Sequence, residues 1–236
     1  MIKVVILAGG KGTRLMPYTS VLPKPLMPID KYCILEIIIK QLSKQNLKDI
    51  IICVNHQAYL IKSYFGNGSK WGVNIDYIQE KKTLSTMGPI KLIKNLTENF
   101  IVMNGDVLTS LNYRSLYNFH KKNKNLFTIS ANARKEDINY GLLKINKKNE
   151  LIDFKEKPDI NYLVSMGIYV LNSKIVNYIP KNKLFGFDHL MIKLLKAKQK
   201  INVKIFNGYW RDIGRPEDFA LVNKEFDKYK RILIDE

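Results

Sequence analysis

The feature that most constrains the fold stands at the start of the chain. A continuous apolar run, Val4–Ala8, ends abruptly in Gly-Gly-Lys-Gly-Thr-Arg-Leu at residues 9–15. A short apolar run bounded by glycines is typical of a strand buried on both faces, as in a parallel sheet covered by helices. Three glycines within four positions let the backbone turn sharply and approach another group closely. The pattern therefore predicts a central strand that ends in a tight, open turn.

The same turn carries groups suited to a polyphosphate. Successive N–H groups of a glycine-rich turn form a concavity that binds anions. Arg14 and Lys24, the latter within Pro-Lys-Pro-Leu at 23–26, add positive charge, and an arginine can hold a phosphate through two parallel hydrogen bonds. The glycine spacing is neither that of the dinucleotide-binding fingerprint nor that of the P-loop. A Gly-Gly-x-Gly alone would also suit an ordinary turn, so the interpretation depends on the rest of the chain.

Strand-like and helix-like segments alternate through the first half of the chain. Apolar runs predict strands at residues 4–8, 49–54, 73–78 and 100–103, and helical patterns predict helices at 34–42, 57–65, 87–96 and 111–122. Repeated strand–helix units indicate an α/β protein. We expect a Rossmann-like three-layer fold around a mainly parallel, mixed central sheet.

The second half of the chain is richer in predicted strands. They fall at residues 126–133, 140–145, 151–155, 164–171, 201–206 and 209–210, with helices at 173–178, 188–196 and 216–229. No stretch resembles a linker, an internal repeat or a low-complexity tract. We therefore expect a single domain over residues 1–236.

Composition narrows the class of protein and its location. A length of 236 residues with 46% hydrophobic content suits one large domain with a substantial core. No apolar run is long enough to span a membrane, and the N-terminus lacks an export signal. Cys33 and Cys53 lie in apolar segments without a metal-ligand pattern. Such cysteines indicate reduced thiols in a cytoplasmic protein.

The net charge of +18 raises the question of an anionic partner. Nucleic acids and membrane surfaces are the usual candidates. The lysines are spread along the chain, often beside asparagine as at residues 121–125, and no helix carries a basic face interleaved with aromatic residues. We expect a lysine-rich solvated surface, no nucleic acid and no membrane partner, and a field that favours anionic substrates in a cleft. The alternative, a basic RNA-binding module, would show salt-sensitive affinity for RNA.

The complete N-terminal string carries a family resemblance. Leu-Ala-Gly-Gly-Lys-Gly-Thr-Arg-Leu at 7–15, followed by Pro-Lys-Pro-Leu at 23–26, resembles the nucleotide-binding loop of the sugar-1-phosphate nucleotidylyltransferases. The motifs follow the family's order as far as about residue 225. The resemblance implies a nucleotide-binding half at about 1–110 and a sugar-phosphate-binding half at about 111–236. It assigns the nucleotide to Leu7, Ala8, Gly9, Gly10, Gly12, Thr13, Arg14 and Lys24.

Two aspartates stand at predicted strand ends, where ligands bind in open α/β sheets. Asp106 follows Val-Met-Asn-Gly at 102–105, and Asp212 ends Gly-Tyr-Trp-Arg-Asp at 208–212. Magnesium prefers a few hard carboxylate ligands and retains some of its waters. Either aspartate alone would suit a turn or a helix cap. The family resemblance implies that both ligate Mg²⁺.

A second set of motifs concerns the sugar phosphate. Glu156-Lys157-Pro158 resembles the family's sugar-phosphate motif, in which Lys157 would clamp the substrate phosphate and Glu156 would accept hydrogen bonds from sugar hydroxyls. The resemblance assigns the sugar phosphate to Asn104, Gly105, Gly141, Glu156, Lys157 and Gly167. At Ser165-Met166 the family usually carries Asn and a small residue, so the identity of the sugar stays open.

The segment at residues 79–89 resembles the family's base-recognition turn. Glu80 matches the position that contacts the base, and Ser85 replaces a glycine ahead of Gly88. A carboxylate only accepts hydrogen bonds. It suits guanine, which offers two adjacent donors, better than uracil or thymine, so we expect GTP. Gln79 would weaken this expectation if it occupied the base-reading position instead.

The implied reaction joins an NTP and a sugar 1-phosphate to give an NDP-sugar and pyrophosphate, with Arg14, Lys24 and Asp106 as catalytic residues. Residues 208–219 and Pro89 most resemble the mannose-1-phosphate guanylyltransferase branch. This favours a mannose- or heptose-type sugar 1-phosphate, and other nucleotidylyltransferases on other sugars remain alternatives. A non-catalytic nucleotide or sugar-phosphate sensor is the alternative of another class. Larger relatives carry a C-terminal β-helix or regulatory module; we expect none here, and a homodimer stays open.

Overall fold

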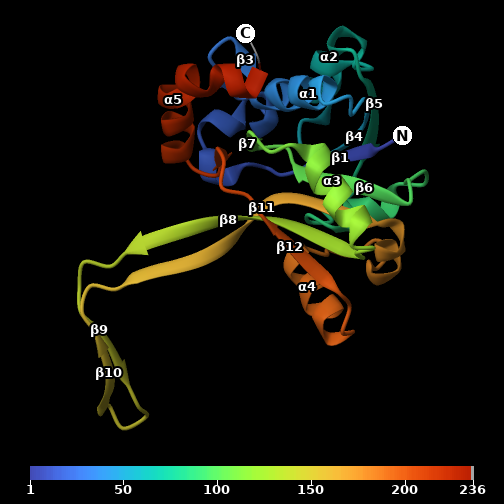
Figure 1. Cartoon of the computed structure of the whole chain (residues 1–236). Helices are drawn as coiled ribbons and strands as arrows, with labels where there is room; N and C mark the ends of the chain where they lie inside the picture. The colour runs from blue at the N-terminus through green and yellow to red at the C-terminus, as the bar shows by residue number, and fades with distance from the viewer. Residues whose placement is uncertain (235–236) are drawn as a thin grey trace.

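A seven-stranded sheet runs through the molecule. The computed structural model describes residues 1–234, and Figure 1 shows the sheet with helices around it. The strand order is β12-β8-β11-β6-β1-β4-β5. The strands are β1 (Lys3–Leu7), β4 (Asp49–Val54), β5 (Asn74–Gln79), β6 (Asn99–Asn104), β8 (Phe127–Asp137), β11 (Asp159–Asn172) and β12 (Ile201–Ile205). Only β11 runs antiparallel to its neighbours, so the sheet is mixed and mainly parallel.

The apolar run that opens the chain forms β1, at the centre of the parallel strands, between β4 and β6. Successive side chains of a strand point to opposite faces. Val4 and Ile6 accordingly belong to one buried cluster and Val5 to another. Both faces of β1 are therefore covered, which explains why the run is uninterrupted rather than alternating.

Helices cover both faces of the sheet and make three layers. The helices are α1 (Ile34–Lys44), α2 (Ala58–Phe65), α3 (Tyr113–Lys122), α4 (Phe187–Lys196) and α5 (Pro216–Ile234). Apolar residues of α1, α2, α3 and α5 pack in the cluster that contains Val4. Those of α4 pack in the cluster on the other face, with the 3₁₀ turns η5 (Gly88–Leu92) and η6 (Ser173–Tyr178). The expected three-layer α/β fold is confirmed.

Short strand pairs close the carboxyl-terminal edge of the sheet. β7 (Val107–Thr109) pairs antiparallel with β13 (Trp210–Asp212), and β2 (Pro28–Ile29) pairs with β3 (Tyr32–Cys33). Because β13 comes from the end of the chain, the β7–β13 pair joins its two halves. Asp212 stands opposite Val107, next to Asp106.

Residues 133–165 form an arm that leaves the body of the molecule (Figure 1). β8 and β11 continue beyond the sheet as a paired ribbon, from Ser165 opposite Ala131 to Asp159 opposite Asp137. A hairpin of β9 (Leu142–Ile145) and β10 (Leu151–Lys155) follows at the far end. Because β11 runs antiparallel to β6, the arm projects past the carboxyl end of β6.

Two predicted elements differ from the structure. The helix expected at residues 87–96 is only the short 3₁₀ turn η5. Its first residues are held elsewhere, since the N–H groups of Met87 and Gly88 both donate to the carbonyl of Phe185 at 3.0 Å. The helix expected at 173–178 is likewise the 3₁₀ turn η6. At the first segment these tertiary hydrogen bonds to Phe185 therefore replace the expected helical pattern.

Candidate active site

One cavity gathers most of the residues that the sequence singled out. It measures about 370 Å³ and lies at the carboxyl ends of β1 and β6. Its walls are formed by Leu7, Ala8, Gly9, Gly10, Arg14, Lys24, Pro25, Cys53, Glu80, Thr83, Ser85, Thr86, Pro89, Asn104, Gly105, Asp106 and Asp212. Carboxyl ends of strands are the ordinary ligand site of an open α/β sheet. The position of the cavity therefore follows from the topology.

The glycine-rich turn forms the floor of the cavity, and its glycines serve different purposes. A Cβ on Gly9 would lie 2.7 Å from Oε1 of Glu80, whereas a Cβ on Gly10 would meet nothing within 4 Å. Gly12 has φ of 64°, the left-handed region that favours glycine. The hydroxyl of Thr19 donates to the carbonyl of Gly12 at 2.8 Å and fixes this conformation. The space beside Gly10 is therefore open to a bound group.

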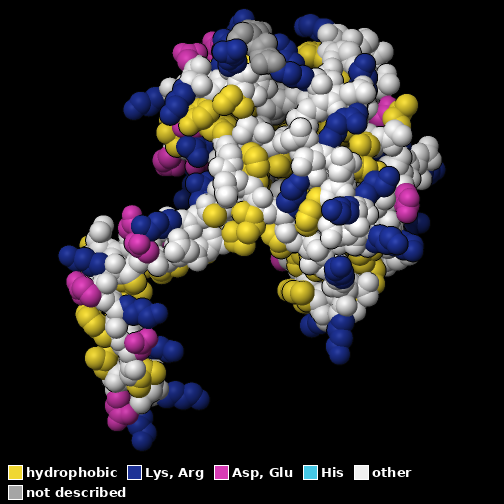
Figure 2. All heavy atoms as spheres, in the orientation of Figure 1, with side chains coloured by type: hydrophobic (Ala, Val, Ile, Leu, Met, Phe, Trp, Pro, Cys, Tyr) yellow, Lys and Arg dark blue, Asp and Glu magenta, His cyan; other side chains and the backbone are white. Residues whose placement is uncertain are grey.

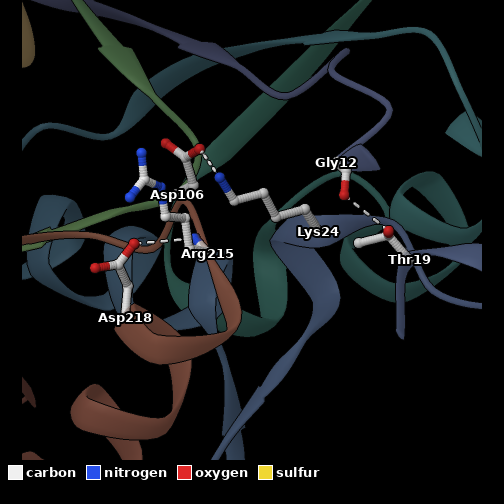
Figure 3. A network of polar contacts seen from close by, with 6 residues as sticks. All are labelled: Gly12, Thr19, Lys24, Asp106, Arg215 and Asp218. Atoms are coloured by element: carbon white, nitrogen blue, oxygen red, sulfur yellow. Dashed lines mark hydrogen bonds and ion pairs between the residues drawn. The ribbon is translucent and has the colours of Figure 1, made fainter. Parts of the chain in front are cut away.

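Lys24 is a buried cation in the wall of the cavity. It begins the 3₁₀ turn η3 (Lys24–Leu26), and Pro23 before it has the extended conformation that directs the chain inward. Lys24 is 9% exposed, and its Nζ is hydrogen-bonded to and ion-paired with Oδ2 of Asp106 (Figure 3). Burying a lysine is costly unless its charge is paired. The pair therefore explains why Lys24 can lie in the interior.

Asp106 and Asp212 form a carboxylate pair. The N–H of Ile213 donates to the carbonyl of Asp106 at 3.0 Å, so the two chain segments are in register at this point. Partial burial raises the pKa of Asp212, the nearby Asp106 raises it further, and Lys24 and Arg14 act in the opposite direction. Two carboxylates this close repel each other and are stabilised by a shared cation.

The donor set fits a divalent metal ion. Oδ1 of Asp106 is buried and has no hydrogen-bond partner among the described residues, and Asp212 faces the same cavity. In residues 1–234 no group of three or more His, Cys, Asp and Glu side chains gathers. Two carboxylates are sufficient for magnesium, which keeps several waters and takes phosphate oxygens as further ligands. The free oxygen of Asp106 is thus available to a cation that arrives with its own ligands.

Glu80 stands in the cavity at the end of β5, and Gln79 does not. Successive residues point to opposite sides of a strand, and Gln79 accepts a hydrogen bond from Lys62 at 2.8 Å on another face. The N–H of Leu84 donates to Oε2 of Glu80 at 2.8 Å and holds the turn that follows. Burial raises the pKa of Glu80, while hydrogen bonds from Leu84 and Asn55 oppose that effect. The position that faces the cavity is thus occupied by the carboxylate.

Ser85 occupies a glycine-like position in this turn. Its φ is 64°, which is uncommon for a residue with a Cβ. The family resemblance places a glycine here, so the backbone conformation is that of the motif although the residue differs. Gly88 lies outside the cavity wall, buried against Phe185.

Several sequence-predicted residues are not brought to the cavity. Gly12 and Thr13 do not line the cavity, and Gly167 (φ 72°) packs so close to Asn104 that a Cβ would lie 2.7 Å from its amide nitrogen. The remaining three residues lie on the exposed arm, away from the cavity: Gly141, Glu156 and Lys157.

The cavity also contains residues that the sequence reasoning missed. Pro25, Thr83, Thr86 and Pro89 fall inside segments that the motifs had marked, between the residues assigned to the ligand. Cys53 is the penultimate residue of β4, the neighbour of β1. Its place at a carboxyl strand end was a usable signal, because such ends share one edge of a parallel sheet.

Comparison with known proteins agrees with this geometry. The sequence pattern of one family, Nucleotidyl transferase, matches residues 3–228. The chain belongs to this family. Nucleotidyltransferases generally use a divalent metal, in keeping with the donor set described above. The resemblance inferred from the motifs is thereby confirmed.

The relatives of the chain include guanylyltransferases. It is 32% identical, over 96% of its length and 99% of the relative's, to D-glycero-alpha-D-manno-heptose 1-phosphate guanylyltransferase of Aneurinibacillus thermoaerophilus. It is 33% identical to the mannose-1-phosphate guanyltransferase of Yarrowia lipolytica over 92% of this chain. It spans only 62% of that longer relative.

A solved structure has the same fold. The crystal structure of HddC from Yersinia pseudotuberculosis complexed with GMP-PN matches 96% of this chain and 100% of its own. The TM-score is 0.74 and the sequence identity 28%. In residues 1–234 no helix is long and apolar enough to cross a membrane.

Proposed function

We propose that the chain is a sugar-1-phosphate nucleotidylyltransferase that uses GTP. The observation that carries the proposal is the Lys24–Asp106 pair, which lies with Asp212 and the Gly9-Gly10 turn around one cavity. Cationic, anionic and backbone groups converge there as two phosphorylated substrates and a metal ion would require. Membership of the nucleotidyl transferase family supports the same reaction class.

In the proposed reaction an oxygen of the sugar 1-phosphate attacks the α-phosphorus of the nucleotide. The new P–O bond forms as the bond to the β-phosphate oxygen breaks, and pyrophosphate leaves with the bonding electrons. The attacking oxygen is already anionic at neutral pH, so the step requires no general base. Catalysis then rests on alignment and charge neutralisation.

The residues of the cavity divide this work. The backbone of residues 9–12 holds the triphosphate, and the space beside Gly10 accommodates it. Arg14 stabilises the charge of the leaving pyrophosphate. Lys24, already inside the wall, neutralises the charge around the α-phosphate. Lys157, which lies on the arm and not in the wall of this cavity, is assigned the remaining task of reducing the repulsion between the two phosphates that must meet.

Asp106 and Asp212 are the residues that would hold Mg²⁺. When bound, the ion would polarise phosphate oxygens and offset their negative charge. Lys24 would orient Asp106 through the contact to Oδ2, which leaves Oδ1 for the metal.

A mannose- or heptose-type sugar 1-phosphate is the proposed second substrate. Both named relatives described above are guanylyltransferases for such sugars. Glu80 supports GTP, because its carboxylate faces the cavity and can accept from two adjacent donors of guanine. We divide the single domain into a nucleotide-binding half at about 1–110 and a sugar-phosphate-binding half at about 111–236.

We further propose a cytoplasmic protein without a nucleic-acid or membrane partner. Both Cys33 and Cys53 are free, burial raises the pKa of both thiols, and that of Cys33 reaches about 12. Buried thiols of this kind are unreactive. On the face in Figure 2 the basic side chains are scattered among other residues rather than gathered in one patch.

The test is a matrix of nucleoside triphosphates against sugar 1-phosphates with Mg²⁺, in which pyrophosphate release is measured. Turnover with GTP and mannose- or heptose-type phosphates is expected. A preference for UTP would overturn the role given to Glu80. UTP is the nucleotide in the name of a 28% identical relative, the UTP--glucose-1-phosphate uridylyltransferase of Synechocystis. Absence of turnover with every pair would overturn the reaction itself.

A further inference from the structure

The residues assigned to the substrate phosphate lie far from the cavity of their own chain. Gly167 marks the rim of the cavity, where it packs on Asn104. From Ser165 outward β11 is an extended strand, and at the usual rise per residue Asp159 lies on the order of 20 Å further away. Glu156 and Lys157 follow beyond Asp159. A lysine side chain does not bridge such a span.

The ribbon that carries these residues does not fold back over the cavity. β8 and β11 pair at every residue between Asp137–Asp159 and Ala131–Ser165. Residues 131–137 and 159–165 contain neither glycine nor proline, at which strands commonly bend. The irregular register lies at the base, between Ser165 and Tyr169, and sets the direction in which the arm leaves the sheet.

The hairpin at the end of the arm has an uncovered apolar face. Leu143 stands opposite Phe154 and Ile145 opposite Leu151, whereas Lys144 and Asp153 share the other face. The four apolar side chains are exposed by 66, 53, 54 and 59%: Leu143, Phe154, Ile145 and Leu151. A two-stranded hairpin alone is marginally stable in water and needs a covered face. Nothing in residues 1–234 covers this one.

The uncovered area is that of an interface. The exposed apolar side chains of the arm also include Tyr140, Ile152, Ile160, Tyr162 and Leu163. With about half of each side chain open, the set presents on the order of 1,000 Å². The area is divided between the two faces of the arm, because consecutive residues such as Tyr162 and Leu163 point to opposite sides of a strand. It matches the roughly 800 Å² per partner of a stable complex.

Charge favours a second copy of this chain as the partner. The arm contains seven basic and six acidic residues, so nearly all of the net charge of +18 lies on the rest of the molecule. Figure 2 shows basic, acidic and apolar side chains interspersed along the arm. The arm is the part of the surface that can approach a strongly basic copy without large repulsion.

We propose that two copies exchange arms, so that Glu156 and Lys157 of each protomer complete the cavity of its partner. This rests on the proposed function, which gives Lys157 the substrate phosphate. Exchange of identical elements across a two-fold axis is an economical route to a dimer. It covers the apolar hairpin and delivers the missing cation in one arrangement.

Complementation between two inactive variants tests the exchange. Lys24→Ala removes the cation of the cavity, and Lys157→Ala removes that of the arm. Each variant alone is expected to lose at least 100-fold of the wild-type rate. Co-refolded in equal amounts, they are expected to recover about a quarter of it, because half of the dimers are mixed and one of their two sites is intact. If each arm served its own cavity, no mixed dimer would contain an intact site, and failure to recover activity would overturn the exchange.

A mass measurement tests the interface without reference to activity. Leu143→Lys places a charge on the apolar face and is expected to weaken dimerisation at least tenfold, while GTP binding stays unchanged. Leu195→Lys, at a side chain of α4 that is likewise 66% exposed, is the matched control and should stay dimeric. A monomeric wild type in sedimentation would overturn the exchange. A dimeric wild type that turns over no substrate pair would instead overturn the proposed function alone.

Discussion

Lys24 and Asp106 define the chemistry of the cavity at the scale of single residues. Because the lysine is buried and paired with a residue of the same chain, its position is set by the fold. Preorganised charges of this kind stabilise a transition state without reorganisation at the moment of reaction. The same pair prevents two carboxylates, Asp106 and Asp212, from facing each other without a compensating cation.

Removal of this cation should slow the reaction severely. Lys24→Ala is expected to lower kcat by about two to three powers of ten, the usual cost of one preorganised charge. Pyrophosphate release at saturating substrates measures the change. Lys230→Ala is the matched control, since Lys230 pairs with Asp30 at 2.9 Å outside the cavity. Equal rates for the two variants would contradict the assignment.

The carboxylate pair makes a separate prediction about the metal. Asp212→Asn keeps the shape of the side chain but removes a charge that favours a cation. The magnesium concentration for half-maximal rate is expected to rise about tenfold or more. Titration of the rate with MgCl₂ measures it. Asp76→Asn, at an exposed carboxylate of β5 outside the cavity, should leave the requirement unchanged.

At the scale of elements, the turn after β1 allows function to be separated from folding. Gly10→Ala adds a methyl group where nothing lies within 4 Å, so stability should stay the same while it occupies the space for the triphosphate. Gly12→Ala forces φ of 64° on an alanine and places its Cβ 2.8 Å from Thr19, which should cost about 1–3 kcal/mol.

Two measurements check this pair of variants. Urea unfolding should distinguish them, with Gly12→Ala alone destabilised. GTP binding should fall at least tenfold in Gly10→Ala, although its unfolding midpoint matches the wild type. A Gly10→Ala variant that binds GTP normally would show that the triphosphate lies elsewhere.

The sequence allowed the central strands to be predicted because each has one continuous apolar run and a marked end. β4 was predicted at its observed bounds, and β1 and β6 within about one residue. The arm could not be predicted in the same way. The charged residues 134–137 gave no sign that β8 continues, because no buried apolar face marks them and they pair only with the exposed residues 159–162 of β11. Beyond the sheet, the extended conformation of β8 depends on its pairing with β11 rather than on burial.

The candidate site shows the same division between local and distant information. Asp106 and Asp212 each follow a strand, so their meeting at one edge follows from topology. The distance of Lys157 from this edge does not follow from topology, because it depends on how far β8 and β11 stay paired beyond the sheet. Ser85 lies between these two cases. A serine does not by itself predict the left-handed conformation found here, but the motif predicts it because it carries a glycine at this position.

At the scale of the whole molecule, His120 of α3 joins its helix to three strands of the central sheet through a buried network. Its Nδ1 lies 2.8 Å from the hydroxyl of Thr128 on β8, and its Nε2 lies 3.1 Å from Oδ1 of Asn99 on β6. Asn172 of β11 donates to the same oxygen at 3.0 Å. The oxygen of Asn99 requires that Nε2 carry the proton, so Nδ1 accepts from Thr128.

This network predicts where the protein loses stability in acid. Burial lowers the pKa of His120 from 6.5 to about 4, so the native state keeps the ring neutral while the unfolded chain takes up a proton. Stability is therefore complete above the unfolded value and falls as the pH drops from 6.5 towards 4. Between about pH 7 and about pH 5 the loss should be about 2 kcal/mol. Urea unfolding at both pH values measures it.

Two variants test the assignment to His120. His120→Gln, which cannot be charged, should be less stable than the wild type at neutral pH but should lose much less stability on acidification. His56→Gln, at an exposed ring, should show the wild-type dependence of stability on pH. An unchanged slope in His120→Gln would mean that another group controls acid unfolding.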